Sequence, residues 1–287
     1  MRQRYVVTNG IRLFCVEEGH GPLVLLLHGW PEFWWSWRHQ LPVIGAAGYH
    51  AVAVDLPGYG RSDKPEVTYD ERWLNACIEG LVPALGHRQV VVAGHDWGGL
   101  LVWPFARRYP ARTAAVIGVN TPDLPRGPVP PVQLMRQLFD PPNYIVQFQD
   151  RGPAEWFLGS DVRAWLEAVF LGPATHRTEV FDAATVDRYA EQFAPLGAVT
   201  PPIEYYRNFD RNWELAADLP ERVDCPALMI MAEHDPVLRP ALADGMEDRV
   251  PKVEKVLVEG SGHWTQQEQP DAVNQAMLRF LGGLGTW

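Results

Sequence analysis

Residues Val90–Pro110 read VVVAGHDWGGLLVWPFARRYP. Apolar β-branched residues predict a buried strand that ends near Gly94, and an apolar helix is expected to follow from Gly98. Asp96 stands between them, in a strand–turn–helix elbow whose sharp bend strains its central residue and requires small neighbours. This places Asp96 at the carboxyl end of a central strand, where open α/β sheets bind ligands. On this stretch alone, Asp96 could instead simply cap the helix.

Further apolar runs of strand length recur along the chain, at residues 4–8, 11–18, 22–29, 50–58, 112–120, 227–235 and 253–263. Helical patterns separate most of them, at residues 31–48, 69–85, 98–110 and 270–283. Pro31 is a plausible first residue of one helix, and Asp70 is a candidate N-cap of another. Asn9-Gly10 predicts a hairpin at the start. Strands that alternate with helices indicate an α/β protein with a mostly parallel, doubly wound sheet.

The alternation stops between Asn120 and Pro226. A proline-rich connection at residues 121–131 leads into short helical patterns at 161–171, capped by Asp161, and at 183–193. We therefore predict a core domain of residues 1–122 and 219–287. Residues 123–218 are predicted to form an inserted helical cap, or lid, over the site.

Composition and charge limit the choice of partners. The chain has 287 residues, 47% of them hydrophobic, and a net charge of −10. The acidic balance argues against nucleic acid and anionic membrane surfaces as main partners. No stretch approaches a transmembrane span, and the N-terminus does not resemble a secretory signal.

The metal-binding and redox signals are weak. The three cysteines are far apart, without C-x-x-C spacing, which favours reduced thiols and a cytoplasmic location. The nine histidines lack metal-ligand spacing, and the glycine-rich stretches have neither the P-loop lysine nor the dinucleotide fingerprint. We expect no metal and no cofactor.

Several motifs together resemble the α/β-hydrolase fold family, and specifically the epoxide hydrolases. They are His28–Pro31 (HGWP), Asp55–Gly60 (DLPGYG), Gly94–Gly99 (GHDWGG), Asp235 in AEHDPV and His263 in GSGHW. In this order the motifs are very specific for the fold, and the resemblance covers nearly the whole chain. It implies the α/β-hydrolase fold with a cap inserted into the mostly parallel sheet.

Asp96 in the elbow excludes a serine esterase. A carboxylate is ionised at neutral pH and can attack a saturated carbon directly, which leaves an alkyl ester on the enzyme. Water must then hydrolyse this ester, and that step needs a base. The resemblance implies that His263 is the base and that Asp235 orients it. Asp123 is a rival for the acid, because some relatives of this fold place their acid after the preceding strand.

The resemblance also implies two other groups of catalytic residues. The backbone N–H groups of Trp30 and Trp97 are the expected oxyanion donors. Tyr144 and Tyr206 match the two cap tyrosines that would hydrogen-bond the epoxide oxygen and supply a proton. A helix capped by Thr200 and started by Pro201 would place Tyr206 on one face with Ile203, Phe209 and Trp213. His95 is expected to pack or support rather than act as a second base. Pocket candidates are Trp35, Trp97, Val237, Leu238 and Trp264.

The expected substrate is a hydrophobic epoxide, which water converts to a vicinal diol, and a homodimer is a possible assembly. Two other functions remain open. Haloalkane and haloacid dehalogenases use the same aspartate nucleophile, although Trp30 stands where they commonly carry a halide-binding asparagine. A non-catalytic hydrolase-like binding protein is the third interpretation, and it predicts loss of the nucleophile, base or acid.

Overall fold

A computed structural model describes residues 1–285 and residue 287. Its described residues contain one eight-stranded sheet in the order β1-β2-β4-β3-β5-β6-β7-β8. The strands are β1 (Arg2–Thr8), β2 (Ile11–Glu18), β3 (Leu23–Leu27), β4 (His50–Val54), β5 (Val90–His95), β6 (Thr113–Val119), β7 (Ala227–Ala232) and β8 (Val253–Val258). β2 pairs antiparallel with β1 and β4, and the remaining pairs are parallel. The predicted hairpin at Asn9-Gly10 and the mostly parallel sheet are both confirmed.

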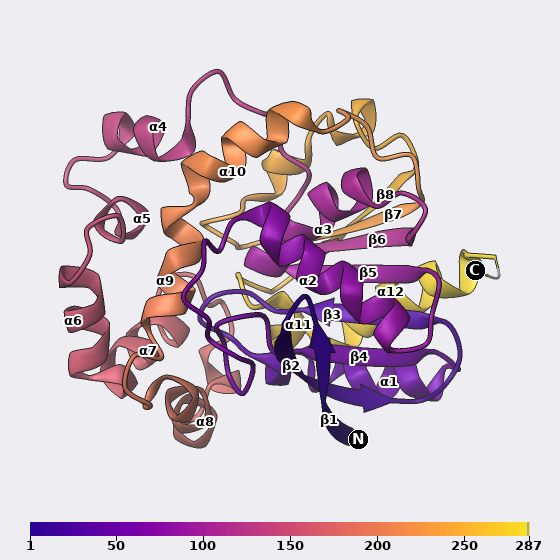
Figure 1. Cartoon of the computed structure of the whole chain (residues 1–287), viewed down its shortest axis with the longest axis horizontal. Helices are drawn as coiled ribbons and strands as arrows, with labels where there is room; N and C mark the ends of the chain where they lie inside the picture. Colours follow the sequence, from indigo (N-terminus) through magenta and orange to yellow (C-terminus); the bar gives the residue numbers. More distant parts are fainter. Residues whose placement is uncertain (286) are drawn as a thin grey trace.

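The sheet is covered by helices on both faces, as Figure 1 shows. They are η1 (Trp34–Trp37), α1 (Gln40–Ala46), α2 (Glu71–Ala84), α3 (Trp97–Arg108), η4 (Pro240–Ala243), η5 (Met246–Asp248), α11 (Thr265–Glu268) and α12 (Pro270–Gly283). Asp70 caps α2 by accepting a hydrogen bond from the Trp73 N–H, as predicted. The central strands β3 and β5 are buried along their whole length, because helices cover both of their faces.

The helix predicted from Pro31 to residue 48 is wrong in its first part. Residues 29–32 form a turn in which the Glu32 N–H donates to the Gly29 carbonyl, Phe33 is extended, and only η1 and then α1 are helical. Tertiary contacts explain this, because the Glu32 side chain is fully buried and binds His95 and Gln267 as well as the Gly29 N–H. A regular helix starting at Pro31 would lose that arrangement.

Residues between β6 and β7 form a helical insertion. Its elements are α4 (Pro131–Leu138), α5 (Tyr144–Gln147), α6 (Pro153–Ser160), α7 (Val162–Phe170), η2 (Thr178–Val180), α8 (Ala183–Phe193), α9 (Thr200–Arg207), α10 (Phe209–Leu215) and η3 (Ala216–Asp218). Most of them gather to one side of the sheet, at the left of Figure 1. Asp161 caps α7, as predicted.

The helix predicted from Thr200 through Trp213 differs in two respects. Thr200 is already helical and makes no side-chain cap, since the N-cap position falls on Val199. The helix is also interrupted at Asn208, whose side-chain amide donates to the Glu204 carbonyl. Phe209 therefore belongs to a separate helix, because a local side-chain bond to the backbone competes with helix continuation.

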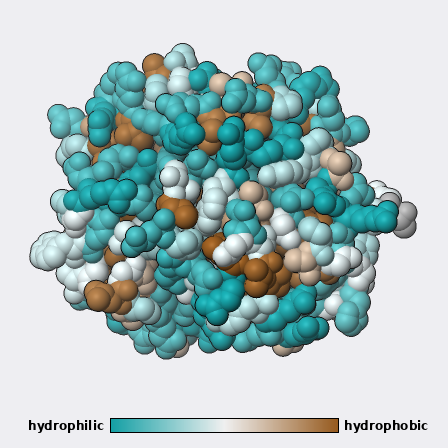
Figure 2. Space-filling view, viewed as in Figure 1, coloured by the Kyte–Doolittle hydropathy of each residue, from teal (hydrophilic) through white to brown (hydrophobic). Residues whose placement is uncertain are grey.

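The outer surface is mostly polar. Figure 2 shows that the face drawn is largely hydrophilic, with apolar residues in small separate groups. Across residues 1–285 and 287, no helix combines the length and apolar character that crossing a bilayer requires.

Candidate active site

Asp96 occupies the predicted elbow between β5 and α3. Its backbone has φ 51° and ψ −115°, a conformation that L-residues rarely adopt. The Gly98 N–H donates to the His28 carbonyl at 3.0 Å, and the Thr121 hydroxyl donates to the Asp96 carbonyl at 3.1 Å. A Cβ atom at Gly98 would overlap the backbone of β3, so this close approach requires glycine. The surrounding contacts thus hold the strained aspartate in place.

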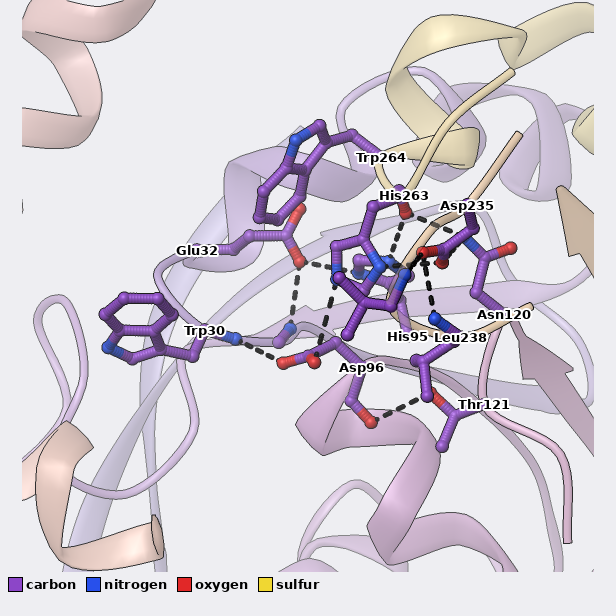
Figure 3. A network of polar contacts seen from close by, with 12 residues as sticks. Trp30, Glu32, His95, Asp96, Asn120, Thr121, Asp235, Leu238, His263 and Trp264 are labelled. Carbon is purple, nitrogen blue, oxygen red and sulfur yellow. Dashed lines mark hydrogen bonds and ion pairs between the residues drawn. The ribbon is translucent and has the colours of Figure 1, made fainter. Parts of the chain in front are cut away.

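His263 lies between two carboxylates (Figure 3). Its Nδ1 is 2.8 Å from Oδ2 of Asp235, and its Nε2 is 3.7 Å from Oδ2 of Asp96. His263 and Asp235 are buried, whereas the Asp96 side chain remains 16% exposed. The first contact orients the imidazole, and the second directs Nε2 toward the elbow.

The Asp235 carboxylate is held by several donors. Its Oδ1 accepts hydrogen bonds from the N–H groups of Val237 and Leu238, at 2.8 and 2.9 Å. Its Oδ2 accepts one from the side-chain amide of Asn120 at 3.0 Å. These bonds fix the carboxylate that faces His263.

Asp123, the rival acid, is engaged elsewhere. It forms a two-pronged ion pair with Arg107, at 2.7 and 2.8 Å, and a second ion pair with Arg249 at 3.0 Å. The geometry therefore favours Asp235 as the partner of His263.

The charges in this cluster shift one another's pKa values. Burial lowers the pKa of His263, but the carboxylates of Asp235 and Asp96 outweigh it and raise that pKa to about 10. Burial raises the pKa of Asp96 and of Asp235, but the imidazole outweighs it and holds both below their usual range. The free site therefore favours an imidazolium between two carboxylates at neutral pH.

Backbone N–H groups flank Asp96. The Trp30 N–H donates to Oδ1 of Asp96 at 2.8 Å. Trp97 is the first residue of α3, and an N–H at that position has no acceptor within its own helix. Both N–H groups are thus suited to stabilise negative charge beside Asp96.

Tyr144 and Tyr206 meet above these residues. Their ring centroids are 5.7 Å apart. The Tyr144 ring stacks on Trp30 at 5.9 Å, and the Tyr206 ring meets Trp30 and Trp97 edge-on at 5.7 and 5.0 Å. Tyr206 is buried, whereas Tyr144 is 39% exposed. Desolvation nevertheless raises the pKa of both phenols above the usual value of 10, with a further contribution from the Asp96 charge. Both hydroxyls therefore remain protonated at neutral pH.

The pocket candidates have different surroundings. The Trp35 ring packs against Phe33 and Tyr189 and lies beneath the guanidinium groups of Arg38 and Arg188, away from the rings around Trp30. Trp264 is buried, and its indole N–H donates to Thr175.

Val237 is 48% exposed, and a pocket role for its side chain stays a prediction. Together with Leu238, its contribution to the site comes from the backbone N–H groups that bind Asp235.

Two residues near the site, Glu32 and Asn120, carried no recognisable signal in the sequence. Buried Glu32 lies 2.9 Å from Nδ1 of His95, whose Nε2 donates to the His263 carbonyl at 2.7 Å. Asn120 has φ 59° and donates to the same carbonyl at 2.8 Å. His95 thus has the supporting position that was expected from the sequence. Residues 1–285 and 287 include no group of three or more potential ligands arranged to hold a metal ion.

Comparisons with known proteins agree with this geometry. Residues 22–270 match the family model described as the alpha/beta hydrolase fold. The chain is 38% identical to Epoxide hydrolase A of Mycobacterium tuberculosis, over 98% of both chains.

Two solved structures are also similar. Epoxide hydrolase A from Mycobacterium thermoresistibile has a TM-score of 0.92 at 37% identity, with 100% of this chain and 99% of that chain covered. An epoxide hydrolase from Vigna radiata has a TM-score of 0.91 at 33% identity, with 98% of each chain covered. The chain is therefore an enzyme of the alpha/beta hydrolase fold family and belongs to its epoxide hydrolases.

Proposed function

We propose that this enzyme converts a hydrophobic epoxide and water to a vicinal diol through an alkyl ester on Asp96. The names of its relatives support the reaction. The observation that carries the mechanism is the meeting of Tyr144 and Tyr206, 5.7 Å apart, around Trp30, whose N–H donates to Asp96. These contacts support a site in which Asp96 is the nucleophile and the two phenols are the proton donors.

In the first step, a carboxylate oxygen of Asp96 attacks an oxirane carbon, and the carbon–oxygen bond of the ring breaks. The ring oxygen leaves as a basic alkoxide and takes a proton from Tyr144 or Tyr206. A halide would leave as a stable anion without such a donor, so the paired phenols favour the epoxide over the haloalkane.

Ester formation changes the charge around His263. The alkylated Asp96 is neutral, so the imidazole loses one of the two carboxylates that raise its pKa to about 10. His263 then releases its proton, which restores the phenol through solvent, and becomes the neutral base for the second step.

In the second step, His263 takes a proton from water, and the hydroxide adds to the ester carbonyl carbon. The N–H groups of Trp30 and Trp97 stabilise the resulting oxyanion. The intermediate collapses, and the diol leaves after taking the proton from His263. Asp96 is left as a carboxylic acid, and its proton returns to His263, which restores the starting ion pair. Asp235 keeps the imidazole oriented throughout.

The helical insertion acts as the cap in this proposal. It supplies both tyrosines, from α5 and α9, and it covers the elbow with their aromatic neighbours. Excluding bulk water strengthens the electrostatic interactions that stabilise the transition state.

A single turnover in heavy-oxygen water, with enzyme in excess over styrene oxide, tests the mechanism. We expect the label to enter Asp96, and the diol of the first turnover to be unlabelled. A labelled diol with an unlabelled protein would refute the ester mechanism. Incubation with a bromoalkane is the companion experiment, since bromide release without diol formation from the epoxide would favour the dehalogenase.

A further inference from the structure

The loop that carries His263 is bound directly to the helical insertion. The insertion segment 174–177 (Ala174, Thr175, His176 and Arg177) lies between α7 and η2. The His263 N–H donates to the Ala174 carbonyl at 2.7 Å, and the Trp264 indole N–H donates to the Thr175 hydroxyl at 2.9 Å. The base is therefore anchored through its own backbone to a segment outside the sheet-bearing core.

Glu268 joins these two segments. The residue is fully buried, and both of its carboxylate oxygens accept backbone hydrogen bonds. From the His263 loop it accepts the N–H groups of Gly262 at 2.9 Å and Trp264 at 3.1 Å. From the insertion it accepts those of His176 at 2.9 Å and Arg177 at 2.8 Å. One buried carboxylate thus fixes the residues on both sides of His263 and the segment that receives it.

The fit between the two segments leaves no room for a side chain at Gly262. A Cβ atom there would lie 2.7 Å from the His176 nitrogen and 3.1 Å from a carboxylate oxygen of Glu268. The glycine therefore permits the close approach of the insertion segment 174–177.

The same segment also contacts the loop that carries the acid. The His176 ring stacks on His234, the residue before Asp235, with 4.2 Å between ring centroids and 24° between planes. The insertion segment therefore lies against the chain on both the base side and the acid side of the His263–Asp235 pair.

We propose that Glu268 is a positioning residue for ester hydrolysis. Through Glu268, the position of His263 depends on how the helical insertion packs against the His263 loop. The inference rests on the proposed function, because only the second step needs His263 as a base. Attack by Asp96 requires the elbow and the two tyrosines. None of the Glu268 hydrogen bonds described above reaches either of them. Catalytic rates are sensitive to displacements of about 1 Å in a reacting group, so a loosened loop affects the second step selectively.

Glu268→Gln is the direct test. The amide keeps the size of the side chain but turns one acceptor into an N–H donor that faces backbone N–H groups. The matched control is Glu233→Gln, since Glu233 also accepts a backbone N–H of the same loop, from Gly260 at 3.0 Å, but is exposed. Rapid mixing of each protein with styrene oxide, acid quenching and intact-protein mass give the rates at which the ester forms and disappears.

We expect Glu268→Gln to slow ester hydrolysis about tenfold to a hundredfold and to change ester formation less than about threefold. The ester then accumulates, so kcat and KM fall together. The control should behave as the wild type. Wild-type rates for both steps in Glu268→Gln would overturn the proposal. So would a reduced amount of active enzyme with unchanged rate constants, which indicates a purely structural role.

Thr175→Val keeps the test decisive if Glu268→Gln does not fold. It removes the hydroxyl that accepts the Trp264 indole N–H and donates to the Phe170 carbonyl, and it leaves Glu268 in place. A slower hydrolysis step, by about threefold or more, supports the proposal, and an unchanged step refutes it. If the proposed ester mechanism is wrong, the wild type itself would produce diol without any ester mass. That result differs from failure of the Glu268 proposal, in which the wild type still forms the ester.

Discussion

Nε2 of His263 lies 3.7 Å from a carboxylate oxygen of Asp96, whereas Nδ1 of the same ring lies 2.8 Å from Asp235. One imidazole thus lies between a tightly bonded carboxylate and a looser one. The looser contact is the one that ester formation would remove. In the proposed reaction, the protonation state of His263 therefore responds to the chemistry at Asp96.

Asp96→Asn should lower the pKa of His263 from about 10, because the amide keeps the size of the carboxylate but removes its charge. Titration of the imidazole by NMR measures this pKa directly. An unchanged His263 pKa in Asp96→Asn would contradict the electrostatic role assigned to Asp96.

Stability should depend on pH through the same histidine. Folding raises the pKa of His263 from 6.5 to about 10, so its stabilising contribution is complete below pH 6.5 and is lost as the pH rises through 10. We expect the difference in unfolding free energy between wild type and His263→Gln to shrink from pH 6.5 to 10. Urea unfolding across this range tests the prediction, and a constant difference would disprove it.

His263→Gln should still form the ester but fail to hydrolyse it. The Asp96 carboxylate needs no base to attack, whereas water does. The intact-protein mass should therefore rise by one epoxide and remain raised. Asp96→Asn is the control that cannot form the ester. An unmodified mass in His263→Gln would argue against the two-step scheme.

The two tyrosines should be partly redundant. In the proposed reaction either phenol can protonate the leaving oxygen, so we expect Tyr144→Phe and Tyr206→Phe each to slow ester formation about tenfold, and the double variant about a thousandfold. Single-turnover measurements of ester formation distinguish this from an effect on hydrolysis. If the double variant retains wild-type ring opening, the phenols are not the proton donors.

Asp235→Asn and Asp123→Asn should have clearly different effects on activity and stability. Asparagine at 235 would keep its one carbonyl oxygen on the N–H groups of Val237 and Leu238 and turn an amide NH2 toward His263. Asp235→Asn should therefore disorient the imidazole and slow ester hydrolysis about a thousandfold. Asp123→Asn should leave the rate constants of the folded enzyme nearly unchanged but lower the unfolding free energy by about 2 kcal/mol, because it breaks partly buried ion pairs with Arg107 and Arg249. The opposite pattern would make Asp123 the catalytic acid.

Local sequence was sufficient for the features that depend on neighbouring residues. The elbow around Asp96, the caps at Asp70 and Asp161 and the hairpin at Asn9 were all predictable, because turn chemistry and periodicity act within a few residues. The same reasoning failed at Pro31 and Asn208. There a buried side chain and a side-chain bond to the backbone overrode the helical pattern.

Local sequence could not predict which distant residues bind the site residues. Glu32 meets His95 across 63 positions, and Glu268 meets His176 across 92. No periodicity relates residues so far apart, because sheet order and the seating of the insertion bring them together.

The sequence by itself thus determined the parallel α/β sheet, the elbow and the candidate nucleophile and base, and it narrowed the acid to Asp235 with Asp123 as a rival. Each of these follows from local patterns and recognisable motifs. Only the tertiary structure decided that Asp235 rather than Asp123 contacts His263, and that the insertion contacts the base loop. Both depend on where distant segments pack, because a hydrogen bond forms only between groups that the whole fold has brought within about 3 Å.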